Sequence, residues 1–279
     1  MQLIVKQLQT DLTNNATLTA YLADNSPEIE PARVRPAVLI CPGGGYAFVS
    51  DREAEPVALR LLAAGYQALV LRYSVGQNHP YPAALLELAT AMQLTRQNAA
   101  AWHINPDQIV VAGFSAGGHL AGSLGTSWDG PLLKRYGFNA AEVKPNALML
   151  AYPVITAGKF AHRDSFLNLL GPKPDEAALA AVSLEHQVSP ATPPTFLWAT
   201  VTDDTVPVEN TLLFANALQA NHVSFELHLF PSGGHGLSLA THETYSQRNA
   251  YGIEPVVAQW VPLFTKWVDT QFNRGPFVA

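Results

Sequence analysis

Short, unbroken apolar runs rich in β-branched residues recur along the chain, and longer segments with a helical apolar period lie between them. Such runs are typical of parallel strands that are buried on both faces. Strand and helix alternate, which predicts an α/β fold with a mostly parallel central sheet and helices on both of its faces. The predicted strands are 37–41, 67–72, 109–112, 147–152, 195–200 and 224–230, and the predicted helices are 53–64, 82–101, the segment after 115, 208–220 and 254–272.

Four segments fall outside this alternation. Residues 3–9 and 16–23 are predicted to form two short strands, a hairpin at one edge of the sheet. Residues 126–145 are expected to form a loop. The stretch from 153 to 194 holds six prolines and only short helical fragments, and it is too long for a simple connection. Long irregular segments inside a domain usually form lids or binding loops, so we expect a small cap over the site.

Composition bounds the class of protein. A chain of 279 residues is long enough for one large α/β domain, and we expect a single domain over 1–279. The net charge of −6, with no basic cluster, argues against a nucleic-acid partner. Cys41 is the single cysteine, which excludes an internal disulfide and suits a reducing compartment. The sequence shows neither an export signal nor a membrane span, so we expect a cytoplasmic protein.

A serine lies where the strand at 109–112 gives way to a helix. Residues 113–117 read GFSAG and match G-x-S-x-G, the motif in which a nucleophilic serine occupies a strained turn between strand and helix. Small residues on either side allow the strand and the helix to pass closely. Ser115 is therefore the candidate nucleophile, and a helix cap is the alternative role for its hydroxyl.

A serine hydroxyl needs a base near neutral pH, and the chain offers nine histidines. His235 lies in the glycine-rich segment SGGHG directly after the strand at 224–230, which would present an imidazole at the carboxyl edge of the sheet. His119 lies one helical turn after Ser115, but its side chain should point back toward the protein body, where a structural hydrogen bond is the commoner fate. We therefore expect His235 to be the base. The histidines expected to have packing or surface roles are His79, His103, His222 and His228.

A carboxylate must hold the base in one tautomer. The segment after the strand at 195–200 supplies two neighbours, Asp203 and Asp204. Asp203 is the preferred candidate, because Asp204 could cap the helix that follows Pro207. The resulting chain order of serine, aspartate and histidine is that of α/β hydrolases.

The negative oxygen of a tetrahedral intermediate needs fixed N–H donors. Ala116 supplies one at the start of the helix after the serine, and the glycine run 43–45 after the strand at 37–41 can supply others. The glycines could instead form only a tight turn, whereas a phosphate-binding loop is disfavoured because no G-x-G-x-x-G or Lys-Ser/Thr context follows. Tyr46 and Phe48 could shorten an acyl pocket or belong to the core.

Four segments, CPGGGY, GFSAGGHLA, PPTFLWATVTDDTVPVEN and GGHGLSL, resemble those of α/β-hydrolase esterases. The resemblance is to the acetyl-xylan-esterase-like and feruloyl-esterase-like group, close to the hormone-sensitive-lipase-like carboxylesterases, and covers about 36–270. It departs at Pro42, where lipase-like members carry the histidine of H-G-G-G. By this resemblance, the triad would be Ser115, Asp203 and His235, and the oxyanion donors would be Gly44, Gly45 and Ala116.

The resemblance implies a serine carboxylesterase that hydrolyses short acyl esters, acetate above all, with an acetylated sugar or similar alcohol. Its partner would be a small-molecule ester, and no metal or organic cofactor is expected. Two alternatives stay open. One is a peptidase or amidase with the same triad, and the other is a non-catalytic binding protein of the same fold. Apolar surface helices also leave self-association open.

Overall fold

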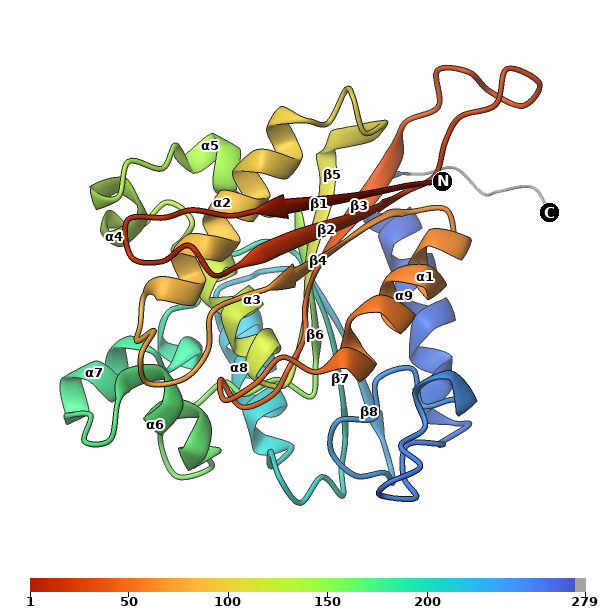
Figure 1. Ribbon diagram of the computed structural model, residues 1–279. Helices are drawn as coiled ribbons and strands as arrows, with labels where there is room; N and C mark the ends of the chain where they lie inside the picture. The colour runs from red at the N-terminus through yellow and green to blue at the C-terminus, as the bar shows by residue number, and fades with distance from the viewer. Residues whose placement is uncertain (274–279) are drawn as a thin grey trace.

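The computed structural model describes residues 1–273 and contains a sheet of eight strands in the order β1-β2-β4-β3-β5-β6-β7-β8 (Figure 1). From β3 onward all neighbouring strands are parallel, whereas β1 and β2 run antiparallel at one edge. The predicted α/β fold and the edge hairpin are therefore confirmed. The strands are β1 (Gln2–Gln7), β2 (Thr17–Leu22), β3 (Arg35–Cys41), β4 (Gln67–Arg72), β5 (Ile104–Phe114), β6 (Ala147–Ala151), β7 (Thr195–Thr200) and β8 (Phe225–Phe230).

Helices cover both faces of the sheet. The main helices are α1 (Glu55–Ala63), α2 (Ala83–Gln97), α3 (Ala116–Ser127), α8 (Glu209–Ala220) and α9 (Trp260–Gln271). In β3, Leu39 packs with α2 and α3, whereas Val38 and Ile40 pack with α1 and α9. Side chains of a strand alternate between its faces, so a continuous apolar run supplies both cores at once. Figure 1 shows α1 and α9 on the opposite side of the sheet from α2, α3 and α8.

Several boundaries differ from the predictions. Strand β5 begins at Ile104 rather than 109, because residues 105–108 that follow Ile104 read NPDQ, are partly or fully exposed and so interrupt the apolar signal. The closing helix starts at Trp260, after a short 3-10 turn at Val257–Gln259, rather than at 254. The expected loop at 126–145 contains two short helices, α4 (Pro131–Arg135) and α5 (Ala140–Val143).

The segment 153–194, called the cap below, contains α6 (Arg163–Leu170), α7 (Glu176–Ala181) and a 3-10 turn at Leu184–His186. Figure 1 shows α6 and α7 beside the end of the sheet at which α3 begins. The expected single domain extends to Ala279, and 274–279 lie outside the described residues. Across residues 1–273, no helix has both the length and the apolar character needed to cross a bilayer.

Candidate active site

Ser115 lies between β5 and α3 in a strained backbone conformation, with φ 54° and ψ −120°. The helix behind it passes so close that a Cβ on Gly117 would come within 2.0 Å of the carbonyl oxygen of Cys41. Only glycine fits there, which explains the last position of the motif. The turn directs the serine to the carboxyl edge of the parallel strands, as the motif predicts.

Two short hydrogen bonds join the three residues expected to form a triad. Ser115 Oγ lies 2.7 Å from His235 Nε2, and His235 Nδ1 lies 2.7 Å from Asp203 Oδ2. A carboxylate can only accept, so Nδ1 carries the proton and Nε2 is free to accept the hydroxyl hydrogen of the serine. The loops after β5, β7 and β8 thus bring the three side chains into one hydrogen-bonded chain.

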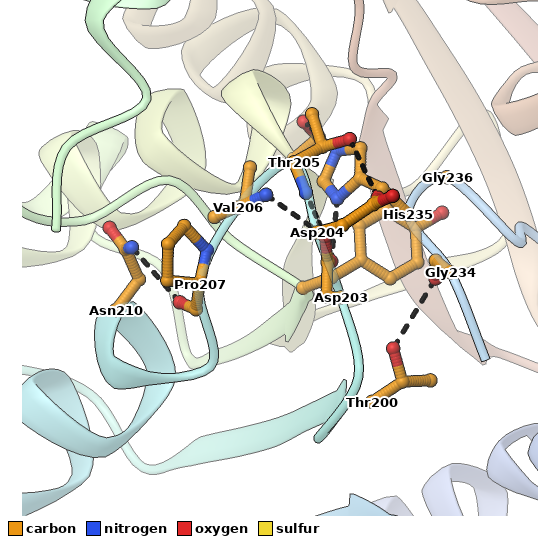
Figure 2. Close-up of polar contacts among 12 residues, drawn as sticks. Thr200, Asp203, Asp204, Thr205, Val206, Pro207, Asn210, Gly234, His235 and Gly236 are labelled. Carbon is orange, nitrogen blue, oxygen red and sulfur yellow. Dashed lines mark hydrogen bonds and ion pairs between the residues drawn. The ribbon is translucent and has the colours of Figure 1, made fainter. Parts of the chain in front are cut away.

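Asp203 and Asp204 have different environments, although they are neighbours in sequence. The side chain of Asp203 is fully buried, and its Oδ1 accepts hydrogen bonds from the N–H groups of Thr205 and Val206, both at 2.9 Å. Asp204 is exposed, and among residues 1–273 its one hydrogen bond comes from the hydroxyl of Thr205, at 3.2 Å. Figure 2 shows the two carboxylates with Thr205 and Val206 beside them. Asp204 does not cap α8, because Val208 occupies the N-cap position and makes no side-chain capping hydrogen bond in the described part of the chain.

The loop that carries His235 is held from three directions. Tyr251 donates its hydroxyl to the carbonyl of His235 at 2.8 Å, and Arg52 Nη1 donates to the carbonyl of Gly236 at 2.9 Å. Thr200 at the end of β7 donates to the carbonyl of Gly234 at 3.3 Å (Figure 2). Each bond fixes a main-chain carbonyl of a loop that is otherwise rich in glycine. The imidazole of His235 is therefore carried by a loop whose main chain is fixed by hydrogen bonds.

The glycine run after β3 contains two kinds of N–H group. The N–H of Gly43 donates to Glu53 Oε2 at 2.7 Å and is therefore already used. Gly44 and Gly45 have φ of 129° and 62° and line the same cavity as Ser115. Within residues 1–273, the N–H groups of Gly44, Gly45 and Ala116 have no hydrogen-bond acceptor. These three are the donors that the motif resemblance implied.

Glu53 and Tyr152 form a buried link that the local sequence pattern does not indicate. Tyr152 donates its hydroxyl to Glu53 Oε1 at 2.7 Å and accepts the N–H of Ser238 at 2.9 Å. Its ring meets the imidazole of His235 edge-on, with centroids 5.1 Å apart. Burial, together with the charge of Glu53, raises the pKa of Tyr152, so its hydroxyl stays protonated. Glu53 thus connects the glycine run to the loop of the base.

His119 has a structural role, as expected. Its Nε2 lies 2.8 Å from the carbonyl oxygen of Val182 in the cap, and its Nδ1 lies 2.8 Å from the hydroxyl of Tyr46. A carbonyl only accepts, so Nε2 carries the proton and Nδ1 accepts from Tyr46. Burial lowers the pKa of His119 to about 4, which keeps the ring neutral. Tyr46 is therefore part of the core, whereas Phe48 is exposed and lines the cavity.

The cavity above Ser115 has a volume of about 390 Å³, within the range of roughly 300–1,000 Å³ that small-molecule sites occupy. Ser115 and His235 line it from the sheet side. The cap contributes His162, Asp164 and Asn168 to the lining of the same cavity. Asn168 Nδ2 also donates to the carbonyl of Gly45 at 2.9 Å, so the cap helps to fix the glycine run.

The mostly parallel sheet and the strand-turn-helix around Ser115 define an α/β-hydrolase. The BD-FAE family model matches residues 25–218, and the chain belongs to that family. Carboxylesterase Cest-2923 from Lactobacillus plantarum WCFS1 is similar over 98% of both chains, with a TM-score of 0.85 and 32% identity. The α/β-hydrolase fold and the resemblance to esterases, both predicted from the motifs, are confirmed.

Other relatives carry names that refer to xylan or xylosides. An acetyl ester-xyloside bifunctional hydrolase from Caldicellulosiruptor lactoaceticus matches with a TM-score of 0.78 and 39% identity, over 91% of this chain and 88% of that one. Endo-1,4-beta-xylanase B of Butyrivibrio fibrisolvens is 38% identical over 76% of this chain, and the acetylxylan esterase of Xylanibacter ruminicola is 30% identical over 75%. The matches span only 34% and 42% of those two relatives.

Proposed function

We propose that this protein is a serine carboxylesterase that works through an acyl-enzyme. The observation that carries the proposal is the hydrogen-bonded chain from Ser115 through His235 to the buried carboxylate of Asp203, at the wall of an open cavity. A hydroxyl in contact with an unprotonated imidazole nitrogen is the arrangement that activates serine as a nucleophile. The strained turn exposes that hydroxyl to a substrate carbonyl.

The reaction has two halves. Ser115 Oγ attacks the ester carbonyl while His235 Nε2 takes its proton, and the tetrahedral intermediate collapses as His235 returns that proton to the leaving alcohol. Water then attacks the acyl-enzyme while His235 takes a proton from it, and the acid leaves as Ser115 recovers its hydrogen. Asp203 stabilises the imidazolium in both halves, and its two backbone hydrogen bonds keep it oriented.

The negative oxygen formed in each half needs donors that are in place before the reaction. The N–H groups of Gly44, Gly45 and Ala116 have this role in the proposal. Gly43 is not proposed as an oxyanion donor, because its N–H is already hydrogen-bonded to Glu53. Asn168 and Glu53 each anchor the glycine run and so support the alignment of its donors.

Short acyl esters, acetate above all, are the proposed substrates, with an acetylated sugar as the natural form. Two relatives whose names contain acetylxylan esterase and acetyl ester-xyloside hydrolase support this choice. Phe48, which lines the cavity beside the glycine run, would limit the length of the acyl chain.

The test is the hydrolysis of p-nitrophenyl acetate, butyrate and octanoate by the wild type and by Ser115→Ala. The proposal expects wild-type turnover that falls with acyl length, and none above background for Ser115→Ala. Turnover that Ser115→Ala retains would refute the nucleophile. An absence of ester turnover combined with hydrolysis of the matching p-nitroanilides would identify an amidase instead.

A further inference from the structure

A second histidine, His162, lines the cavity but belongs to neither the triad nor the glycine run. It lies in the cap directly before α6, and its side chain is half-buried. Its Cε1 is 3.8 Å from the point that a Cβ on Gly45 would occupy, so the ring faces the glycine run. The ring thus lines the cavity from the cap, next to the glycine run.

The hydrogen bond of His162 to Ser165 determines which ring nitrogen carries the proton. Ser165 is fully buried, and within residues 1–273 its hydroxyl has one partner, His162 Nδ1 at 2.8 Å. A buried hydroxyl with one acceptor in reach donates its hydrogen there. Nδ1 therefore accepts, and Nε2 carries the proton of the neutral ring.

The cavity wall then presents a donor and an acceptor that the protein does not use. Within the described part of the chain, His162 Nε2 has no acceptor, and the exposed carboxylate of Asp164 has no hydrogen bond or ion pair. Asp164 lines the same cavity, two residues further along. One N–H donor beside one carboxylate is complementary to alcohol hydroxyls, which both donate and accept.

We propose that His162 and Asp164 bind free hydroxyl groups on the alcohol half of the ester, so that the site prefers polyhydroxy alcohols. This inference rests on the esterase function proposed above. It concerns the alcohol half because His235 must protonate the leaving oxygen, and His162 lines the same cavity close enough to His235 for their charges to interact. Burial is the main cause that lowers the pKa of His162, and the charge of His235 lowers it further against the opposing charges of Asp164 and Asp203, which favours the neutral ring.

A matched pair of substrates tests the proposal. Glycerol monoacetate and propyl acetate share the acyl group and the length of the alcohol, but only the first has free hydroxyls. For His162→Ala and Asp164→Ala, which remove the donor and the acceptor, we expect KM for glycerol monoacetate to rise about tenfold, the loss of a hydrogen bond to substrate, with propyl acetate changed less than about twofold. Ser165→Ala, which releases the ring tautomer, should have a smaller effect in the same direction.

Two changes in the same cap serve as controls, because both residues are exposed and lie outside the cavity. His186→Ala and Glu176→Ala should leave the KM of both substrates unchanged. An equal loss on both esters, or no loss on glycerol monoacetate, would overturn the inference while ester turnover by the wild type still supports the proposed function. A wild type that hydrolyses neither these esters nor p-nitrophenyl acetate would refute both. Thermal unfolding of each variant reports whether the cap still folds.

Discussion

The histidine loop and the cap both line the cavity, and they differ in how their polar groups are satisfied. Around His235 the imidazole and three loop carbonyls all have protein partners. On the cap, His162 Nε2 and the Asp164 carboxylate have none within residues 1–273. Satisfied groups fix one geometry, whereas unsatisfied groups at a cavity wall are available to a ligand. The comparison suggests that the sheet side carries the chemistry and the cap carries recognition of the alcohol.

Among variants of the sheet side and of the cap, Ser115→Ala should cause the largest loss of activity. Loss of the nucleophile should reduce kcat for p-nitrophenyl acetate by a factor on the order of 10⁶, since removing the serine of a triad costs about as much as removing all three residues. No cap variant should approach this loss. The midpoint of urea unfolding should stay close to that of the wild type, which separates a catalytic loss from a folding defect. A cap variant as inactive as Ser115→Ala would invalidate the comparison.

The second effect distinguishes the neighbouring carboxylates. Asp203→Asn should reduce kcat by roughly 10⁴, because the amide no longer selects the Nδ1–H tautomer of His235. Asp204→Asn removes only an exposed acceptor and should change kcat by less than about twofold. Steady-state kinetics on p-nitrophenyl acetate measures both. The reverse ranking would exchange their roles.

The third effect concerns His119, which connects the two sides by bonding Tyr46 after the glycine run and Val182 in the cap. Its pKa is about 4 in the folded protein against 6.5 in the unfolded chain, so unfolded chains bind the proton first as pH falls. The free energy of unfolding should therefore drop below pH 6.5 and level off below pH 4. This contribution amounts to about 3 kcal/mol.

Urea unfolding at pH 7 and pH 4 measures this drop. Between these values the wild type should lose about 3 kcal/mol more stability than His119→Gln does. His186→Gln is the matched control, because His186 is an exposed histidine of the cap, and it should lose as much as the wild type. Equal losses in wild type and His119→Gln would contradict a neutral, buried ring.

The smallest effect tests the link between the glycine run and the histidine loop. Glu53→Gln keeps the shape of the side chain but removes one of the two acceptors that Gly43 and Tyr152 use. We expect kcat to fall about tenfold with little change in KM, since the oxyanion donors lose alignment while substrate contacts remain. Glu55→Gln, an exposed neighbour, is the control. A change in KM alone would indicate that Glu53 binds substrate.

The sequence predicted the elements whose signals are local. The apolar runs located six parallel strands to within a few residues, except for the polar start of β5, and the G-x-S-x-G motif placed Ser115 at a strand end. Asp203 and His235 follow strands, so topology alone brings them to the same edge of the sheet. The fold class and the spacing of the motifs were therefore enough to predict these three residues.

The residues that support the triad or line the cavity have no local sequence signal. Glu53 was predicted as the first residue of an ordinary helix, and its burial depends on Gly43 and on Tyr152, which is 99 residues away. His162 lies in a proline-rich segment without periodicity, and its place in the cavity follows from how the cap packs. Such contacts between distant segments are set by tertiary packing, which a local pattern does not encode.

The most direct measurement is the labelling of the intact protein with a fluorophosphonate, followed by mass spectrometry and peptide mapping. An activated serine should take up a single adduct, mapped to Ser115, and labelling should slow strongly in Asp203→Asn and disappear in Ser115→Ala. An unlabelled wild type, or a Ser115→Ala protein that labels at the wild-type rate, would contradict a nucleophile activated by His235 and Asp203.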